Sequence, residues 1–545
     1  MTRRVLAALL LLTLAGGRSS GQAPGGGPGA GAEQQARIDA VFSPFTGATP
    51  GCAVGVARGG AVLVERAYGL ADLEHDVPNR PDTIFEAGSV AKQVVAAAVL
   101  LLARDGKLSL DDPLRKYIPE LPEYGAPLTI RHALTHTSGL RDWGEIASLG
   151  GWPRGSRAHT QAHVLEIAAR QRSLNFAPGT NWSYSNTGYN LAAMAVSRLS
   201  GQTFAEFCRQ RLFEPRGMSH TSWRDDHTRV VKGRAVAYGD EKDGFHERMP
   251  FEDAHGNGGL LTTVGDLLRW NQRFDAPQPG EADDVRQQQA AATLSTGETI
   301  DYALGLFISR HRGALEIGHG GSTGGYRAYL ARYPDQRLSV ALLCNVSSAD
   351  AEKRARAVAD LFLPDARAAV PPAMPVASAF LDARAGLYRS TATGRPLRVV
   401  RDAEGLRIEG AERLLPGSAS RFALAGGDRV LEFGEGSSAV LHLGNGLSER
   451  YERVEPAHPS GQALQELAGV YASEEAEVAY GVMVQKGELK LWRRPNVLFA
   501  ARPAYADAFE VAGLGTVRFL RKQGRVAEMS IATDRVWDLR LARIE

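Results

Sequence analysis

The 545-residue sequence has few cysteines and no excess of one charge. Its three cysteines, Cys52, Cys208 and Cys344, are far apart and odd in number, which argues against a disulfide framework and excludes a CxxC metal pair. We therefore expect three unpaired thiols that are buried as small hydrophobic groups. Lys plus Arg (63) nearly equals Asp plus Glu (61), so no basic field is present to hold nucleic acid or an anionic membrane.

The sequence also lacks an apolar run long enough to cross a bilayer. The run Val5–Ala15 follows two arginines and is about half the length of a spanning helix. Small residues follow near Gly21–Ala23, so the pattern predicts a secretory signal peptide over residues 1–23, with a short membrane anchor as the alternative. Residues 24–32 are almost only Gly, Pro and Ala, typical of a linker. We expect a secreted or periplasmic mature chain without a membrane span.

Glycine, by contrast, is abundant at 60 residues, which indicates many turns and much β structure. Ala53–Ala57 and Ala61–Tyr68 flank a Gly-Gly turn and predict a hairpin. Tyr326–Tyr333 and Leu338–Leu343 predict a second hairpin, and the residues between the two hairpins have mainly helical patterns. This order predicts an α+β domain over residues 33–365, whose antiparallel sheet joins both ends of the segment.

The pattern changes after residue 365 to short alternating runs that are typical of strands. Ala385–Ser390 (Ala-Gly-Leu-Tyr-Arg-Ser) recurs as Ala468–Ser473 (Ala-Gly-Val-Tyr-Ala-Ser), and Arg421–Leu424 has a counterpart in Ala508–Val511. The period is too long for a solenoid repeat and favours two small barrels or sandwiches in tandem. The predicted segments are a proline-containing linker over 366–378 and two barrel-like domains over 379–456 and 457–545.

The strongest chemical signal is Ser89-Val-Ala-Lys92. It opens a segment, Ser89–Arg104, that is apolar on nearly every side and predicts a buried helix. Lys92 lies three residues after Ser89, so both side chains occupy one helical face. A serine hydroxyl needs a base to become a nucleophile. Taken alone, a capping serine and a surface lysine would also explain the pattern, but a lysine in an apolar helix is costly to bury without a partner.

The second signal is Tyr184-Ser-Asn186, on a loop that enters a predicted helix over Thr187–Leu199. A lysine near Tyr184 would favour the phenolate and lower the pKa of the phenol. Asn186 offers a hydrogen-bond donor and an acceptor. In isolation, a turn with a capping asparagine explains this segment equally well.

The third signal is His319-Gly320-Gly321-Ser322, after a short strand-like run. The two glycines would let a substrate approach the backbone closely. An edge strand here could donate an N–H to an oxyanion.

Together, and in this order, the three motifs resemble those of the serine penicillin-recognising superfamily, which includes class C β-lactamases, DD-carboxypeptidases, D-aminopeptidases and esterases. The resemblance spans Glu33–Leu363. It implies that Ser89 is the acylated nucleophile and that Lys92 and Tyr184 transfer the proton. It further implies that Asn186 positions the substrate and that the backbone N–H groups of Ser89 and Ser322 form the oxyanion hole.

One departure concerns the third motif, where many members of the superfamily carry Lys-Thr-Gly and this chain has His319. A histidine is largely uncharged at neutral pH, so we expect weak carboxylate recognition and inefficient β-lactam hydrolysis. The resemblance is then closest to the D-aminopeptidase and esterase branch, whose architecture the tandem barrels also resemble. We expect a small-molecule or short-peptide substrate and no cofactor or metal. The oligomeric state and the choice among D-peptide, ester and β-lactam stay open.

Two alternatives remain at this point. One is a carboxylesterase of the same fold, and the other is a non-catalytic protein that binds cell-wall fragments.

His132 and His136 have i, i+4 spacing but lack the intervening glutamate of a HExxH metal site, so we interpret them as structural. His255 precedes a glycine-rich turn that borders the pocket in the superfamily, which makes it a weaker candidate for binding.

Overall fold

A computed structural model describes residues 31–364 and 376–545, except 412, 419, 426–428, 435 and 445. The predicted signal peptide over 1–23, nearly all of the linker over 24–32 and most of the linker over 366–378 lie outside the described residues. Within the described ranges, no helix is both long enough and apolar enough to cross a membrane.

The first domain is built on a six-stranded antiparallel sheet with the strand order β12-β13-β14-β15-β1-β2. The strands are β1 (Cys52–Arg58), β2 (Ala61–Tyr68), β12 (Phe307–His311), β13 (Ala314–Thr323), β14 (Tyr326–Tyr333) and β15 (Leu338–Cys344). Both predicted hairpins are present, and β1 pairs with β15. The sheet therefore joins the two ends of the domain, as the sequence predicts.

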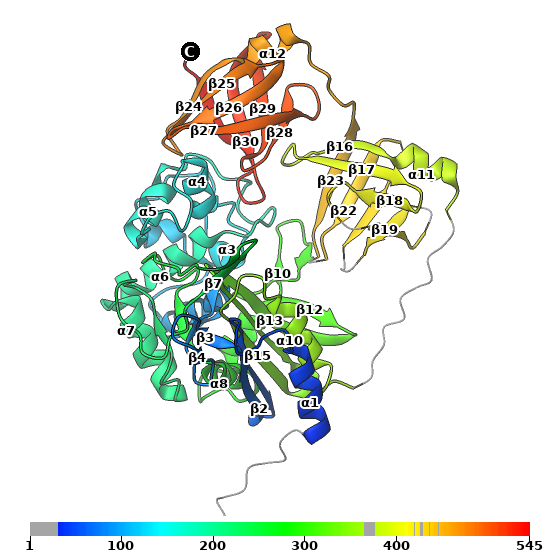
Figure 1. The fold of residues 1–545 in the computed structure, drawn as a ribbon. Helices are drawn as coiled ribbons and strands as arrows, with labels where there is room; N and C mark the ends of the chain where they lie inside the picture. Colours follow the sequence, from blue (N-terminus) through cyan, green and yellow to red (C-terminus); the bar gives the residue numbers. More distant parts are fainter. Residues whose placement is uncertain are drawn as a thin grey trace, which may run out of the picture.

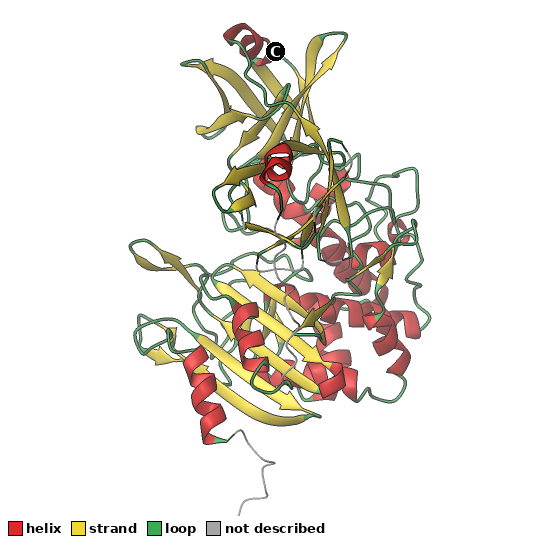
Figure 2. Ribbon diagram, turned by 90° about the vertical axis from the view of Figure 1, so that its right-hand side faces the viewer, coloured by secondary structure: helices red, strands yellow, loops and turns green. Residues whose placement is uncertain are grey.

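Both faces of this sheet are covered, because alternate residues of the central strands enter different cores. Val54 and Val340 pack with helices α1 (Ala32–Val41) and α10 (Ala351–Ala359). Ala53 and Leu343 pack on the other face with α2 (Lys92–Arg104), α6 (Asn186–Ser200) and α8 (Val264–Asp275). Figure 2 shows the sheet between these two helical layers. The remaining helices are short: α3 (Ile130–Leu134), α4 (Trp143–Leu149), α5 (Gln161–Arg170), α7 (Phe204–Cys208) and α9 (Ala282–Gln289).

The expectation of three unpaired cysteines is wrong. Cys52 and Cys344 form a disulfide, because they are register partners on the adjacent strands β1 and β15. Their separation of 292 residues hides this pairing in the sequence. Cys208 is buried and free, as expected of a small hydrophobic residue.

Two closed eight-stranded antiparallel barrels follow the first domain (Figure 1). The first contains β16 (Gly386–Ser390), β17 (Pro396–Asp402), β18 (Gly405–Ile408), β19 (Arg413–Pro416), β20 (Arg421–Leu424), β21 (Val430–Phe433), β22 (Ser438–His442) and β23 (Ser448–Val454). The second contains β24 (Gly469–Ser473), β25 (Val478–Gln485), β26 (Glu488–Arg493), β27 (Val497–Pro503), β28 (Ala508–Val511), β29 (Gly515–Lys522), β30 (Arg525–Ala532) and β31 (Leu539–Arg543).

The sequence repeat corresponds to equivalent elements of the two barrels. A short helix precedes each barrel, α11 (Ser378–Arg384) and α12 (Gly461–Leu467), and the repeated tyrosine lies on the first strand of each. The Tyr388 hydroxyl donates to the Arg384 carbonyl at 3.0 Å, and the Tyr471 hydroxyl donates to the Leu467 carbonyl at 2.8 Å. The second pair of matched segments forms β20 and β28, the fifth strand of each barrel.

The second barrel packs directly on helices α4 and α5 of the first domain (Figure 1). Trp143 and Ile167 belong to the same buried apolar cluster as Tyr480 of this barrel. The Tyr480 hydroxyl also donates to the Leu149 carbonyl at 2.6 Å. The two barrels contact each other through a small cluster that includes Tyr505. The second barrel therefore shares a buried apolar interface with the helical part of the first domain.

Candidate active site

Ser89 lies in a 3₁₀ turn, Gly88–Ala91, that leads into the buried helix α2. The predicted helix therefore exists, but its first turn is tighter than an α-helical one. Gly88 has a φ of 51°, a conformation that favours glycine. A Cβ atom at this position would lie 2.6 Å from the backbone nitrogen of Ser322. Glycine at 88 thus allows the turn carrying Ser89 to touch strand β13.

Lys92 is fully buried below Ser89 and makes three polar contacts. Its Nζ donates to the carbonyl oxygen of Asn257 at 2.7 Å and to Oδ1 of Asn186 at 2.9 Å. The third contact joins Nζ and the Ser89 Oγ at 3.1 Å. A neutral amine has two N–H groups and one lone pair, so the two acceptors leave the lone pair facing the serine hydroxyl.

Burial lowers the pKa of Lys92 far below its ordinary value, because the ammonium loses its hydration. The nearby Arg535 lowers this pKa further. Burial conversely raises the pKa of Tyr184, and this outweighs the opposing effects of its contact with Ser89 and of Arg535. The prediction that Lys92 would help Tyr184 ionise is therefore wrong: desolvation favours the neutral form of both groups.

Tyr184 and Asn186 are placed by the start of helix α6. Asn186 is its first residue, and Asp142 accepts the Asn186 backbone N–H at 2.8 Å. The Tyr184 ring lies over the amine, 4.9 Å from the Lys92 Nζ. The capping asparagine considered for this segment is thus a direct hydrogen-bond partner of the buried lysine.

His319 lies on β13 and is buried, with its Nδ1 2.6 Å from the Gly320 carbonyl oxygen. Its Nε2 is 3.3 Å from the Tyr302 hydroxyl, which is also 3.1 Å from Nε2 of His136. Burial, assisted by the neighbouring Lys92, lowers the pKa of His319 to about 3. His319 is therefore uncharged, as predicted, while His136 supports it through Tyr302.

The third motif runs directly beside the serine turn. A Cβ atom on Gly321 would lie 2.0 Å from the Ala87 carbonyl oxygen and 3.2 Å from the Ser89 nitrogen. The strand and the turn thus approach each other more closely than a side chain would allow, which brings the backbone N–H groups of Ser89 and Ser322 to one place. A cleft of about 720 Å³ is lined there by Ser89, Tyr184, Asn186, His319, Gly320, Gly321 and Ser322. Lys92, the remaining predicted residue, lies beneath it.

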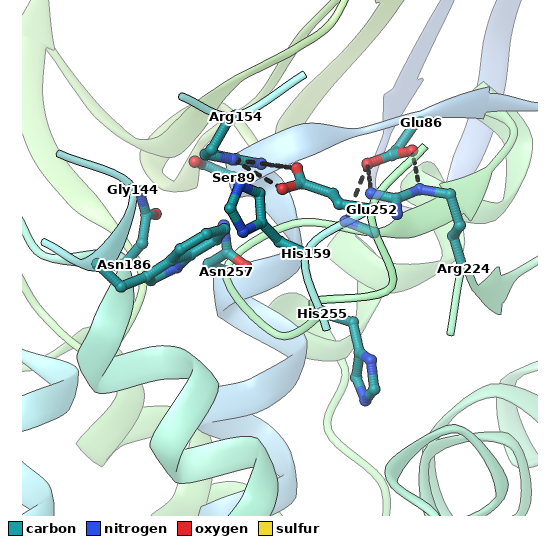
Figure 3. A network of polar contacts seen from close by, with 12 residues as sticks. Glu86, Ser89, Gly144, Arg154, His159, Asn186, Arg224, Glu252, His255 and Asn257 are labelled. Carbon is teal, nitrogen blue, oxygen red and sulfur yellow. Dashed lines mark hydrogen bonds and ion pairs between the residues drawn. The ribbon is translucent and has the colours of Figure 1, made fainter. Parts of the chain in front are cut away.

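Buried ion pairs hold the segments around the serine (Figure 3). Glu86 accepts two hydrogen bonds from the Arg224 guanidinium at 2.8 and 3.0 Å. Its carboxylate also accepts the Gly259 backbone N–H at 3.1 Å, which fixes the turn whose Asn257 carbonyl receives Lys92. Arg154, which lines the cleft beside Ser89, is paired with Glu252.

Sequence reasoning did not assign roles to Asn257, Asp142 and Arg535, although all three contact the site. Arg535 comes from the second barrel, and its guanidinium carbon is 4.8 Å from the centre of the Tyr184 ring. No local pattern marks this residue, because its position depends on how the barrel packs against the first domain. His255 lines a different cavity beside α6 and α7, away from the Ser89 cleft.

In the described part of the chain, one group of side chains lies close enough together to hold a metal ion: Asp226, His227 and Asp253. Asp253 already accepts the His227 backbone N–H at 2.8 Å, and its carboxylate is 2.8 Å from the ring Nδ1. These residues do not line the serine cleft. The i, i+4 histidines, His132 and His136, instead make hydrogen bonds to neighbouring protein groups.

An antiparallel sheet whose strand touches a serine–lysine turn defines a serine hydrolase of the β-lactamase/transpeptidase-like fold. Residues 38–362 match the family model described as Beta-lactamase, which covers more than half of the chain. The chain belongs to the beta-lactamase family. Both the predicted superfamily and the predicted fold class are confirmed, with the two C-terminal domains being closed barrels.

Similar proteins extend beyond this domain. A D-aminopeptidase of Gluconobacter oxydans is 29% identical over 459 residues, which cover 82% of this chain and 84% of that protein. The structure of an octameric penicillin-binding protein homologue from Pyrococcus abyssi has a TM-score of 0.55 at 21% identity and covers 86% and 99% of the two chains. The structure of a D-amino acid amidase from Ochrobactrum anthropi has a TM-score of 0.52 at 21% identity. The match covers 61% of this chain and 99% of the amidase.

Proposed function

We propose that the protein is an exported serine hydrolase that cleaves a small amide or ester through a Ser89 acyl-enzyme, with D-amino-acid peptides as the leading substrates. The observation that carries the proposal is the geometry of Lys92. Asn186 and Asn257 accept hydrogen bonds from its Nζ, and the Ser89 Oγ lies 3.1 Å from the same nitrogen. In the neutral amine, the two asparagine contacts use both N–H groups and leave the lone pair for the Ser89 hydroxyl. A neutral amine in this position is a general base.

In the proposed acylation step, Ser89 Oγ attacks the substrate carbonyl carbon while its proton passes to Lys92. The backbone N–H groups of Ser89 and Ser322 stabilise the oxyanion that forms. The carbon–nitrogen bond then breaks, and the leaving nitrogen needs a proton. Tyr184 supplies it, because its raised pKa keeps the phenol protonated beside Ser89. The proton held by Lys92 then returns to Tyr184.

Deacylation repeats these steps with water as the nucleophile. Lys92, again neutral, removes a proton from water, and the hydroxide adds to the acyl carbon. The bond to Ser89 Oγ then breaks, and the serine recovers its proton from the ammonium. The products are a carboxylic acid and the free enzyme. All protons are accounted for by Ser89, Lys92, Tyr184 and water, and no atom changes its oxidation state.

Three observations support the substrate class. The names of the similar D-aminopeptidase and D-amino acid amidase refer to the D configuration of the residue on which these proteins act. The Oδ1 atom of Asn186 binds Lys92, which leaves its NH₂ group in the cleft for a substrate carbonyl. His319 is neutral, so the third motif lacks the cation that carboxylate-bearing β-lactams would need.

Export is supported by the leader-like segment over residues 1–23 and by the Cys52–Cys344 disulfide. Structural disulfides persist in oxidising compartments outside the cytosol. Fractionation of cells with an antibody against the chain would test this part. Recovery of the protein in the cytosolic fraction, with the leader uncleaved, would contradict it.

A serine-reactive phosphonate and a substrate panel test the catalytic part. We expect the probe to label Ser89 and the Ser89→Ala variant to lose turnover while keeping the wild-type circular dichroism spectrum. The panel should contain D-alanine p-nitroanilide, its L enantiomer and p-nitrophenyl acetate. Preference for the D anilide supports the proposal, turnover of the ester alone identifies a carboxylesterase, and a chain that is neither labelled nor active is a binding protein.

A further inference from the structure

Arg535 reaches the active site from the second barrel. It lies in the segment between β30 and β31 and lines the same cleft as Ser89. The first domain fixes this segment, because Asn175 donates to the Arg535 carbonyl at 3.0 Å and accepts the Trp537 backbone N–H at 2.9 Å. The first barrel fixes it as well through an ion pair of 2.6 Å between Arg395 and Asp534. All three domains thus contact the segment that carries this arginine.

The other arginines of the cleft are already committed to partners. Arg154 is paired with Glu252, and Arg356 is paired with Glu316 on β13 at 2.6 Å. Arg327 donates through Nη1 to carbonyl oxygens of its own turn at 2.8 and 3.1 Å. Arg154 and Arg356 therefore stabilise the walls of the cleft through ion pairs, whereas Arg327 is held by its own turn.

The pairing of Arg535 is weaker. Its Nη1 lies 3.7 Å from Oδ2 of Asp142, and its side chain is 38% exposed. The Asp142 carboxylate also accepts the backbone N–H groups of Gly144, Glu145 and Asn186. Because those bonds share the charge of Asp142, the Arg535 guanidinium keeps donors for an anion that enters the cleft.

The place of Arg535 identifies the part of the substrate that it meets. Its guanidinium stacks on the ring of Tyr184, whose hydroxyl contacts Ser89. In the proposed mechanism Tyr184 protonates the leaving nitrogen, so Arg535 lies on the leaving-group side. In a peptide cleaved before its last residue, the carboxylate carbon is two bonds from that nitrogen. His319, which lies on β13, is uncharged and therefore cannot provide a positive charge for this carboxylate.

We propose that Arg535 binds the terminal carboxylate of the leaving amino acid, so that the enzyme prefers peptides with a free C-terminal carboxylate over their amides. This inference rests on the proposed acyl-enzyme function. It deepens that function by assigning the substrate class to short peptides that end in a free D-amino acid. It also gives the second barrel a role in specificity, as the source of the cation that His319 does not provide.

The test compares D-alanyl-D-alanine with D-alanyl-D-alaninamide, which differ only in the terminal carboxylate. We expect the wild-type enzyme to have a higher kcat/KM for the acid. Arg535→Ala should reduce the acid-to-amide ratio of kcat/KM by about 10- to 100-fold, mainly through KM of the acid. Arg535→Lys should restore part of the ratio, because a lysine keeps the charge without the planar fork.

Arg327→Ala is the matched control, since Arg327 lines the same cleft and is held by its own turn. We expect it to leave the ratio unchanged. An unchanged ratio in Arg535→Ala, an equal loss for both substrates, or a shift caused by Arg327→Ala would overturn the inference. Phosphonate labelling of Ser89 separates this from the parent proposal: an unlabelled wild-type protein refutes the acyl-enzyme itself, whereas labelled proteins with an unchanged ratio refute only the role of Arg535.

Discussion

Lys92 makes the folded protein sensitive to pH, because its side chain is buried in the form that carries no charge. The unfolded chain binds a proton at this lysine up to its ordinary pKa of 10.5, and the folded chain releases the proton well below that value. The folded state therefore gains stability from this residue as pH rises toward 10.5 and bears the full cost below its depressed pKa. The base of the proposed mechanism is thus held at the expense of stability.

We predict that Lys92→Met abolishes turnover and raises the melting temperature relative to wild type, with a larger difference at pH 6 than at pH 9. Asn186 and Asn257 do not titrate, so the loss of their contacts changes the melting temperature by the same amount at pH 6 and at pH 9. Thermal unfolding at several pH values measures the slope. A difference in melting temperature that does not change with pH would show that Lys92 is charged in the folded state.

At the scale of single residues, the sequence indicates which side chains meet but not their protonation. The spacing of Ser89 and Lys92 predicts their contact, since three residues on a helix bring two side chains to one face. The raised pKa of Tyr184 depends on the depth of burial, which residues from the whole domain determine. The roles of Asn257 and Asp142 were equally hidden, because they act through a backbone carbonyl and a helix cap.

The contact between β13 and the serine turn is an element-scale feature that glycine permits. We predict that Gly321→Ala destabilises the protein by about 1–3 kcal/mol and removes most activity, because its Cβ would overlap the Ala87 carbonyl oxygen. Gly320→Ala is the control for stability, since its Cβ would meet Tyr329 at an ordinary distance of 3.6 Å. Unfolding curves compare the two variants, and p-nitrophenyl acetate turnover measures the activity of Gly321→Ala. Equal tolerance of both would contradict the close approach.

The disulfide joins the start of β1 to the end of β15, two adjacent inner strands of the sheet. We predict that Cys52→Ser lowers the free energy of unfolding by about 2–4 kcal/mol, because the unfolded chain loses its cross-link. Cys208→Ser is the control, because it also replaces a buried cysteine with serine but breaks no disulfide. Thiol counting under denaturing conditions should find one reactive thiol in the wild-type chain, and three would refute the bond.

Elements were predictable where their pattern is local. The hairpins of the sheet and the buried helix α2 follow from alternation and from continuous apolar runs. The cysteine pair could not be inferred, because strand pairing between Cys52 and Cys344 is a property of the sheet order. The segment between the hairpins was predicted as mainly helical, and it contains the longer helices α2, α6 and α8 together with several shorter helices and short strands.

At the scale of the whole molecule, Arg141 connects the first domain to the second barrel. Its side chain is 1% exposed and forms an ion pair with Glu475. We predict that Arg141→Ala destabilises the protein by about 3–5 kcal/mol, because it leaves a carboxylate unpaired in the interface. Arg172→Ala removes an exposed pair across the same interface, with Glu474, and should cost about 0–1 kcal/mol. Differential scanning calorimetry distinguishes the two, and equal effects would contradict the prediction.

The overall architecture was predictable in part. The repeated Ala-Gly-x-Tyr segment indicates two similar β domains, because each copy forms the first strand of a barrel. The docking of the second barrel on α4 and α5 was not visible, since it depends on apolar side chains from both domains that look like ordinary core residues. The cation that this docking brings to the cleft could not be located for the same reason.

The distance between the two cysteines along the chain has a consequence for biosynthesis. At about 5–20 residues per second, a ribosome needs roughly 15–60 s to add the 292 residues between Cys52 and Cys344. Cys208 is made in that interval, so it is the first thiol that Cys52 can meet. Once α7 has packed, burial of Cys208 raises its pKa and keeps the thiol protonated and unreactive. Burial of Cys208 therefore removes a competing thiol and favours Cys344 as the partner of Cys52.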